Sequence, residues 1–373
     1  MFGPKAPVTL SVLVLAGLWS AASPAAAGDF LIKASGKSAA EVRASWTPER
    51  FLATDALPLP QVSREENLES LATWDEPSDD DASVAIAGRP PRVHRSVRPR
   101  FLFDPADKRQ RVSLMAEDFG QVHDEDVGSA KAFFSSSQVL ALNYHEIYPY
   151  STVGRLFFNQ GACSASVIAP RIVLTAAHCV HNGTEFHENF VFMPGFRTGS
   201  APREVWAGVA FIVPANWAKT KGKLPNKTDY ALIEVEDRQI GGTLTRLGDL
   251  VGTLGIRTKR LFPNHLTLLG FPANIDEGTI LHRVDAGSFR KGSQSTVSYG
   301  SDMMFGSSGG PWIQSFGVAG LGQALAEGPN EVVGVTSFGS LSPVPKLANS
   351  STLDKPFLEI LAGICANREG NCT

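Results

Sequence analysis

Three short segments, carrying a histidine, an aspartate and a serine in that order, constrain this chain more than any other feature of it. Their central residues are His178, Asp229 and Ser308. A serine hydroxyl is a weak nucleophile near neutral pH and needs an adjacent base to take its proton. An imidazole suits that task, and a buried carboxylate can fix its tautomer and stabilise the imidazolium. The segments therefore predict a site with Ser308 as nucleophile, His178 as general base and Asp229 as the orienting carboxylate.

The order of the three residues separates the folds that could carry them. The run 306–310 also satisfies the G-x-S-x-G pattern of α/β-hydrolases, in which the catalytic histidine follows the serine. The last histidine here is His282, so that pattern fails. In the subtilisin order the aspartate comes first, but no acidic residue before His178 begins an apolar run as Asp229 does. The order His, Asp, Ser is that of the chymotrypsin type.

With these motifs the chain resembles the chymotrypsin/trypsin-like serine endopeptidases over residues 148–345. It is most similar to the glutamyl-endopeptidase-like (V8-like) branch, because its cysteines are few and Ser307, before the nucleophile, is not acidic. The resemblance implies an all-β fold of two six-stranded β-barrels with the site in the cleft between them. It also implies a C-terminal helix on the second barrel, and apolar residues recur at helical spacing within 353–366.

The resemblance further assigns the site residues to the two barrels. His178 and Asp229 would come from the first barrel and Ser308 from the second. The backbone N–H groups of Gly306 and Ser308 would form the oxyanion hole. Gly306 and Gly309 permit the backbone conformations that such a sharp turn needs.

Two regions bear on which peptide would be bound. Asp302 lies six positions before Ser308, where trypsin-like enzymes carry the aspartate that selects Arg or Lys at P1. Met304 replaces the cysteine that fixes this loop in those enzymes, and Thr336 stands nearest to the place where glutamyl specificity would want a histidine. The choice between a basic and a glutamyl P1 residue stays open, with the basic residue preferred. The segment expected to pair with the substrate backbone as an added strand is Ser337, Phe338 and Gly339.

Four cysteines allow three pairings. Cys163 and Cys179 flank two strand-like runs that would pair as a hairpin, and in the resembled family a disulfide here ties the strand that carries the base. Cys365 and Cys372 would then close a small C-terminal loop. Disulfides fit an exported protein.

The N-terminus has the features of a secretory signal peptide, residues 1–27. Lys5 supplies positive charge, an apolar run covers 8–19, and the small residues 25–27 offer a cleavage site. The run is too short for a comfortable membrane span, although a retained anchor is the alternative. We therefore expect a secreted protein, extracellular or periplasmic, with no membrane association after cleavage.

Residues 28–146 form a segment that we expect to be weakly structured, before a protease domain over 147–373. An acidic stretch, 65–83, and an Arg- and Pro-rich stretch, 89–111, lack sustained periodicity. This segment is either a propeptide or an N-terminal extension that stays attached. Ser307 cannot form the ion pair that switches digestive zymogens on, so a pro-segment would block the cleft or assist folding.

Composition agrees with an all-β enzyme. The chain has 373 residues with 43% hydrophobic and 19% charged content, enough for a large core. A net charge of −3 argues against nucleic acid or an anionic membrane as partner. We expect a monomeric serine endopeptidase that acts on proteins or peptides without a cofactor or metal. The alternative is an inactive homologue that serves as a secreted binding protein.

Overall fold

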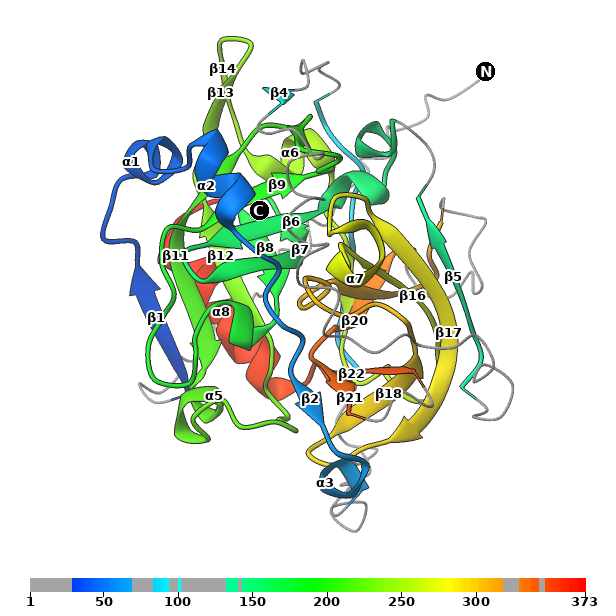
Figure 1. The fold of residues 1–373 in the computed structure, drawn as a ribbon. Helices are drawn as coiled ribbons and strands as arrows, with labels where there is room; N and C mark the ends of the chain where they lie inside the picture. The colour runs from blue at the N-terminus through cyan, green and yellow to red at the C-terminus, as the bar shows by residue number, and fades with distance from the viewer. Residues whose placement is uncertain are drawn as a thin grey trace, which may run out of the picture.

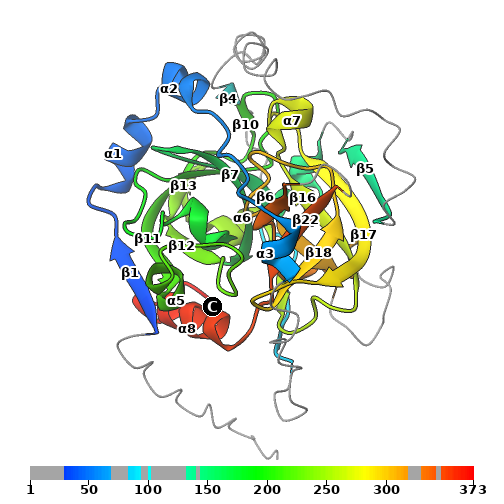
Figure 2. The ribbon, with the colours of Figure 1, turned by 60° about the horizontal axis from the view of Figure 1, so that its bottom comes forward.

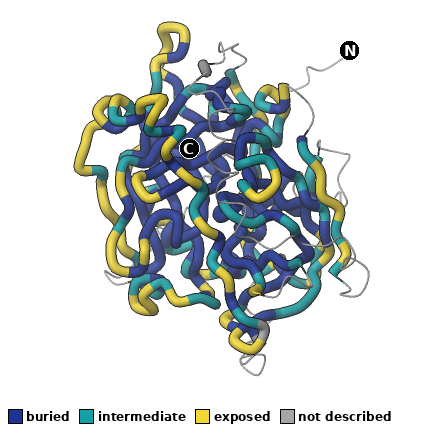
Figure 3. Tube along the Cα trace, viewed as in Figure 1, coloured by how far each residue is buried: buried dark blue, intermediate teal, exposed yellow. Residues whose placement is uncertain are grey.

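The computed structural model describes seven stretches of the chain: 29–68, 83–93, 100–101, 132–139, 143–317, 329–341 and 346–373. The predicted signal peptide, 1–27, lies outside these described residues. Two β-barrels stand side by side (Figure 1), and buried residues concentrate in their strands (Figure 3). No described helix is both long and apolar enough to cross a membrane.

The first barrel is closed and antiparallel throughout. Its strands follow the order β9-β6-β7-β8-β12-β11, and β11 pairs back with β9. They are β6 (Val153–Phe158), β7 (Gly161–Ala169), β8 (Ile172–Thr175), β9 (Val191–Pro194), β11 (Trp206–Pro214) and β12 (Ala231–Val235). Apart from one position in β11, every residue of these strands is buried. Burial of this much apolar surface is the main stabilising contribution to the barrel.

The second barrel follows the order β20-β19-β16-β17-β18-β22. It closes because β20 runs on into β21, so that residues 331–340 pair with β19 through their first part and with β22 through their last. The strands are β16 (His265–Gly270), β17 (His282–Lys291), β18 (Thr296–Gly300), β19 (Pro311–Gln314), β20 (Glu331–Val335), β21 (Phe338–Ser340) and β22 (Leu347–Ser351). The predicted two-barrel architecture is confirmed.

Short elements border the barrels. The remaining strands are β1 (Phe30–Ala34), β2 (Gln61–Val62), β3 (Ala85–Ile86), β4 (Arg100–Phe101), β5 (Phe134–Gln138), β10 (Ser200–Ala201), β13 (Arg238–Ile240), β14 (Thr243–Thr245) and β15 (Gly255–Arg257). Of these, β4 pairs with β10 and β13 with β14 in separate two-stranded sheets. Helices are α1 (Ala39–Ala44), α2 (Pro48–Ala53), α3 (Arg64–Leu68), α5 (Ala215–Lys219), α6 (Leu247–Val251), α7 (Ala273–Asp276) and α8 (Lys355–Asn367), with 3₁₀ turns η4 (Tyr144–Glu146), η5 (Tyr150–Thr152) and η6 (Ala177–Cys179).

Part of the N-terminal segment is folded against the barrels. Strand β1 pairs antiparallel with β11, and α1 begins with a capping box between Ser38 and Glu41. After α1, the ring of Trp46 stacks on Phe51, and both rings contact Phe157 of the first barrel. These helices have six residues each, too few for an apolar period to stand out in the sequence.

Helix α8 was predicted correctly, but its packing partner was not. The buried residues Phe357, Ile360 and Ile364 face β11 and β12 of the first barrel, not the second barrel as the resemblance implied. Tyr230, at the entry to β12, holds this arrangement: its ring packs edge-on against Phe357 and its hydroxyl donates to Asp354 at 2.8 Å.

We expect Ile360→Ala to lower the free energy of unfolding by about 2–5 kcal/mol, because it leaves a cavity between α8 and the first barrel. The matched control is Leu244→Ala in the β13–β14 hairpin, where the side chain is 61% exposed and the change should stay within about 0.5 kcal/mol. Urea unfolding of both variants measures this. Equal effects of the two changes would show that α8 does not contribute as described.

Candidate active site

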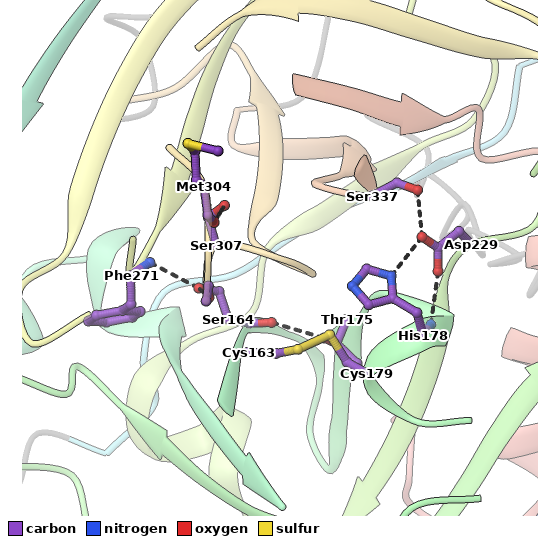
Figure 4. The surroundings of a disulfide bond; sticks show 11 residues. Cys163, Ser164, Thr175, His178, Cys179, Asp229, Phe271, Met304, Ser307 and Ser337 are labelled. Carbon is purple, nitrogen blue, oxygen red and sulfur yellow. Dashed lines mark hydrogen bonds and ion pairs between the residues drawn. A yellow bond between two sulfur atoms is a disulfide. The ribbon is translucent and has the colours of Figure 1, made fainter. Parts of the chain in front are cut away.

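Two neighbouring strands of the first barrel bring His178 and Asp229 together. His178 lies in η6, the turn that follows β8, and Asp229 lies two residues before β12 begins. Because Ala231 of β12 stands opposite Thr175 of β8, both residues emerge at the same end of the barrel. His178 Nδ1 lies 2.8 Å from Asp229 Oδ2, and the backbone N–H of His178 donates to Asp229 Oδ1 at 2.9 Å (Figure 4).

The carboxylate of Asp229 is fully buried and receives donors from both barrels. Besides the two contacts from His178, the hydroxyl of Ser337 in the second barrel donates to Oδ2. The backbone N–H of Asp229 lies 3.3 Å from the hydroxyl of Ser351, also in the second barrel. A buried carboxylate without partners would cost several kcal/mol. The sequence presented Ser337 only as part of a substrate-binding strand, so this side-chain contact was missed.

The turn that carries Ser308 belongs to the second barrel but is fastened to the first. Ser164 of β7 donates its backbone N–H to Ser308 O and its hydroxyl to Gly306 O, both at 2.8 Å. The same hydroxyl accepts from the backbone N–H of Phe271 at 2.9 Å (Figure 4). Two bonds from Ser164 therefore fix the turn on the first barrel, and the third joins Phe271 of the second barrel to the same hydroxyl.

Gly309 brings the same turn onto the end of β8. A Cβ at this position would lie 2.0 Å from Thr175 Oγ1 and 2.5 Å from the carbonyl oxygen of Ser164. Gly309 has φ +77° and Gly306 has φ +80°, a region that favours glycine. The turn thus lies against the residues that lead into η6 and His178.

Two reactive atoms are buried without a hydrogen-bond partner within the described stretches: Ser308 Oγ and His178 Nε2. One is a hydroxyl donor, and the other is an acceptor whenever the proton of the neutral ring is held on Nδ1 by Asp229. A hydrogen bond between a catalytic hydroxyl and its base is often long in the absence of substrate and tightens only when substrate is bound.

Both predicted disulfides are formed: Cys163–Cys179 and Cys365–Cys372. The first joins β7, next to Ser164, to the turn of His178, so the turn of His178 and the anchor of the Ser308 turn are covalently tied. Its sulfurs lie within 4.8 Å of a His178 ring nitrogen. Since they form a disulfide, they offer no thiolate to a metal.

Burial disfavours the protonated form of two further histidines of the first barrel. It lowers the pKa of His187 to about 4 and also lowers the pKa of His181. The ring of His187 stacks on Phe158 at 5.0 Å, and His181 Nδ1 accepts from the backbone N–H of Gly183 at 3.0 Å. The ring of His187 is therefore neutral near pH 7.

The predicted substrate-binding residues lie in the second barrel. Asp302 stands between β18 and β19, and its Oδ1 is buried with no hydrogen-bond partner in the described part. The hydroxyl of the buried residue Thr336 accepts from Trp312 Nε1 at 2.9 Å. Phe338 and Gly339 form part of β21, which pairs with β22 along one edge.

Comparisons with known proteins agree with this architecture. The family model for trypsin matches residues 143–349, more than half of the chain. The glutamyl endopeptidase of Bacillus licheniformis is 24% identical over 227 residues, which cover 56% of this chain and 67% of that protein. Among solved structures, the protease Anisep from Arthrobacter nicotinovorans is 23% identical with a TM-score of 0.50, covering 62% of this chain and 100% of its own. A Glu endopeptidase in complex with MPD is 20% identical with a TM-score of 0.49, covering 62% of this chain and 96% of its own.

Gly309→Ala should damage the site through a steric clash in addition to backbone strain. Gly242, with φ +80° and nothing within 4 Å of its Cβ position, provides the matched control. Gly242→Ala should cost only the strain of about 1–2 kcal/mol, whereas Gly309→Ala should cost clearly more. Thermal unfolding of both variants measures the difference, and equal losses would mean that the turn does not press on β8.

Proposed function

Since this chain belongs to the trypsin family of serine endopeptidases, we propose that His178, Asp229 and Ser308 are its catalytic residues and that it is an exported enzyme. The observation that carries the proposal is the 2.8 Å contact between His178 Nδ1 and Asp229 Oδ2. It leaves the opposite ring nitrogen, Nε2, free to accept a proton.

In the proposed mechanism Ser308 Oγ attacks the carbonyl carbon of the scissile peptide bond while its proton passes to His178 Nε2. The imidazolium then gives this proton to the leaving amine as the carbon–nitrogen bond breaks. A water molecule then attacks the carbonyl carbon of the acyl-enzyme and passes a proton to the same nitrogen. The bond between this carbon and Ser308 Oγ breaks, the imidazolium returns the proton to Oγ, and the acid product leaves. Asp229 remains ionised and stabilises the imidazolium in both steps.

The backbone N–H groups of Gly306 and Ser308 are the proposed oxyanion donors. Each such donor is worth about 100- to 1,000-fold in rate, because it is already aimed where negative charge develops. The left-handed conformation of Gly306 and the anchoring of its carbonyl by Ser164 support this role.

For specificity we propose a basic P1 residue, with Asp302 as its partner and Ser337, Phe338 and Gly339 as the strand that binds substrate backbone. The support is the buried, unpartnered Oδ1 of Asp302, since an uncompensated carboxylate oxygen favours a cationic side chain. Glutamyl specificity would need a cation or histidine instead, and Thr336 offers neither.

For processing we propose a signal peptide over 1–27, a propeptide over 28–146 and a protease domain over 147–373. Two disulfides support maturation in an oxidising compartment, extracellular or periplasmic. The substrates are proteins or peptides, and the enzyme is expected to act as a monomer.

Ser308→Ala should abolish cleavage of a peptide library and labelling by a fluorophosphonate probe. The expected loss in kcat is about 10⁵- to 10⁶-fold, because the whole acyl-transfer route disappears. Mature wild-type protein that is folded, freed of its N-terminal segment, and neither cleaves nor labels would instead favour the inactive binding protein.

Asp302→Asn should lower kcat/KM for Arg and Lys at P1 by about 30-fold or more, since losing one partner of a buried charge pair costs about 2–5 kcal/mol. Asp285→Asn, on β17 and paired with Arg283, is the control and should leave P1 preference unchanged. A wild-type preference for Glu at P1 would make Asp302 structural.

A further inference from the structure

A segment of the N-terminal extension, residues 55–62, contacts both barrels beside the proposed site; we call it the strap. It follows α2 and ends in β2, and Figures 1 and 2 show this blue chain running between the two barrels. On the first barrel, Ala162 donates its N–H to Asp55 O at 2.9 Å, and Leu57 donates its N–H to Ala162 O at 2.8 Å. Ala162 directly precedes Cys163, so the strap begins next to the disulfide that ties the base.

The centre of the strap accepts the hydrogen bond of one proposed oxyanion donor, the backbone N–H of Gly306. Leu57 O accepts from the backbone N–H of Gly306 at 3.1 Å. The Cβ of Ala56 lies 3.0 Å from the position that a Cβ on Gly306 would take, so the two segments are in close contact. A substrate carbonyl cannot receive this N–H while Leu57 holds it.

The end of the strap occupies the edge proposed for substrate. Strand β2 pairs in parallel with β21, with Gln61 opposite Gly339. Gly339 donates its N–H to Pro60 O at 2.8 Å, and Leu341 donates its N–H to Val62 O at 3.1 Å. Because β22 already pairs with the other edge of β21, a substrate strand has no free edge on which to add.

Folded elements hold the strap at both ends. Before it, the rings of Trp46 and Phe51 pack on Phe157 of the first barrel. After it, Asn67 of α3 is buried, and its amide donates to Asn349 of the second barrel at 3.2 Å. The strap is thus tethered across both barrels at a high effective concentration.

The side chains of the strap favour an extended chain that packs against β21. Leu59 is 3% exposed, and its Cδ2 lies 3.1 Å from the Cβ position of Gly339. Pro58 and Pro60 fix their own φ angles and disfavour helical backbone at Leu57 and Leu59. An extended chain is therefore prepared before docking, which reduces the entropy lost when it docks.

We propose that the strap is a built-in inhibitor that fills the oxyanion donor and the substrate edge together. This inference rests on the proposed function, because it assigns an inhibitory role to contacts with Gly306 and Gly339. The strap leaves the Asp229–His178 pair formed, so it acts by occupying the cleft. Activation then means undocking or removing residues 55–62.

The test uses the full chain and measures the rate at which a fluorophosphonate probe labels Ser308. Leu59→Asp places a charge in the buried contact with Gly339 and should release the strap, so labelling should rise by about tenfold or more as the open fraction grows. The control is Leu31→Asp, on β1 in the same extension, where the side chain is 37% exposed; its rate should match wild type. Intact mass confirms that each sample is uncut, and Ser308→Ala marks the background.

The outcomes separate the two proposals. Equal labelling of wild type and Leu59→Asp overturns the inhibitor, provided that both cleave peptides. No labelling and no cleavage by any variant overturns the proposed function instead. Leu59→Ala, which loses packing without adding charge, covers the case in which Leu59→Asp fails to fold and should show a smaller rise. A synthetic peptide of residues 54–63 should slow the labelling of either released variant, and failure to do so also counts against the inhibitor.

Discussion

The hydrogen bonds to the fully buried carboxylate of Asp229 are the interactions on which the rest of this structure depends. An isolated carboxylate in the interior would be costly, so its position requires that donors converge on it. The ring and backbone of His178 supply two from the first barrel, and the hydroxyl of Ser337 supplies one from the second. Ser337 lies between β20 and β21, where the second barrel closes. The orientation of the His178 ring and the position of the junction between β20 and β21 therefore depend on the same buried carboxylate.

A second set of contacts places the turn of Ser308 against this centre. Ser164 holds the carbonyl oxygens of Gly306 and Ser308 from the first barrel, and Gly309 allows the turn to lie on Thr175. These are mainly backbone contacts, so they define the path of the chain independently of the side chain at position 308. Contacts between the two barrels thus fix the position of the Ser308 turn relative to His178.

The sequence predicted what is local and missed what depends on distant partners. The motifs around His178 and Ser308 identified the two-barrel fold, and the spacing of Cys163 and Cys179 indicated their disulfide. The second side-chain partner of Asp229, the hydroxyl of Ser337, lies 108 positions away, and no pattern in one sequence reports such a contact. Helix α8 was visible from its apolar period, but the period does not say which barrel it packs against. In the extension, elements of two to six residues are too short to show a period. The alternation of leucine and proline over 57–60 was the available signal, since it favours extended chain.

The geometry around Ser307 bears on how such an enzyme can be kept latent. In a chain with an acidic residue at this position, an ion pair could assemble the site after cleavage of the precursor. Ser307 instead donates its hydroxyl to the carbonyl of Met304 within its own turn, and that bond needs no new N-terminus. The Asp229–His178 contact and the left-handed turn at Gly306 are also formed while the N-terminal segment is docked. Since these parts of the site are already in place, activity has little to gain from a further step that assembles the site. The remaining means of control is occupancy of the cleft. A strand on the proposed substrate edge, with its carbonyl oxygen bonded to the N–H of Gly306, competes for the same groups that a substrate would use.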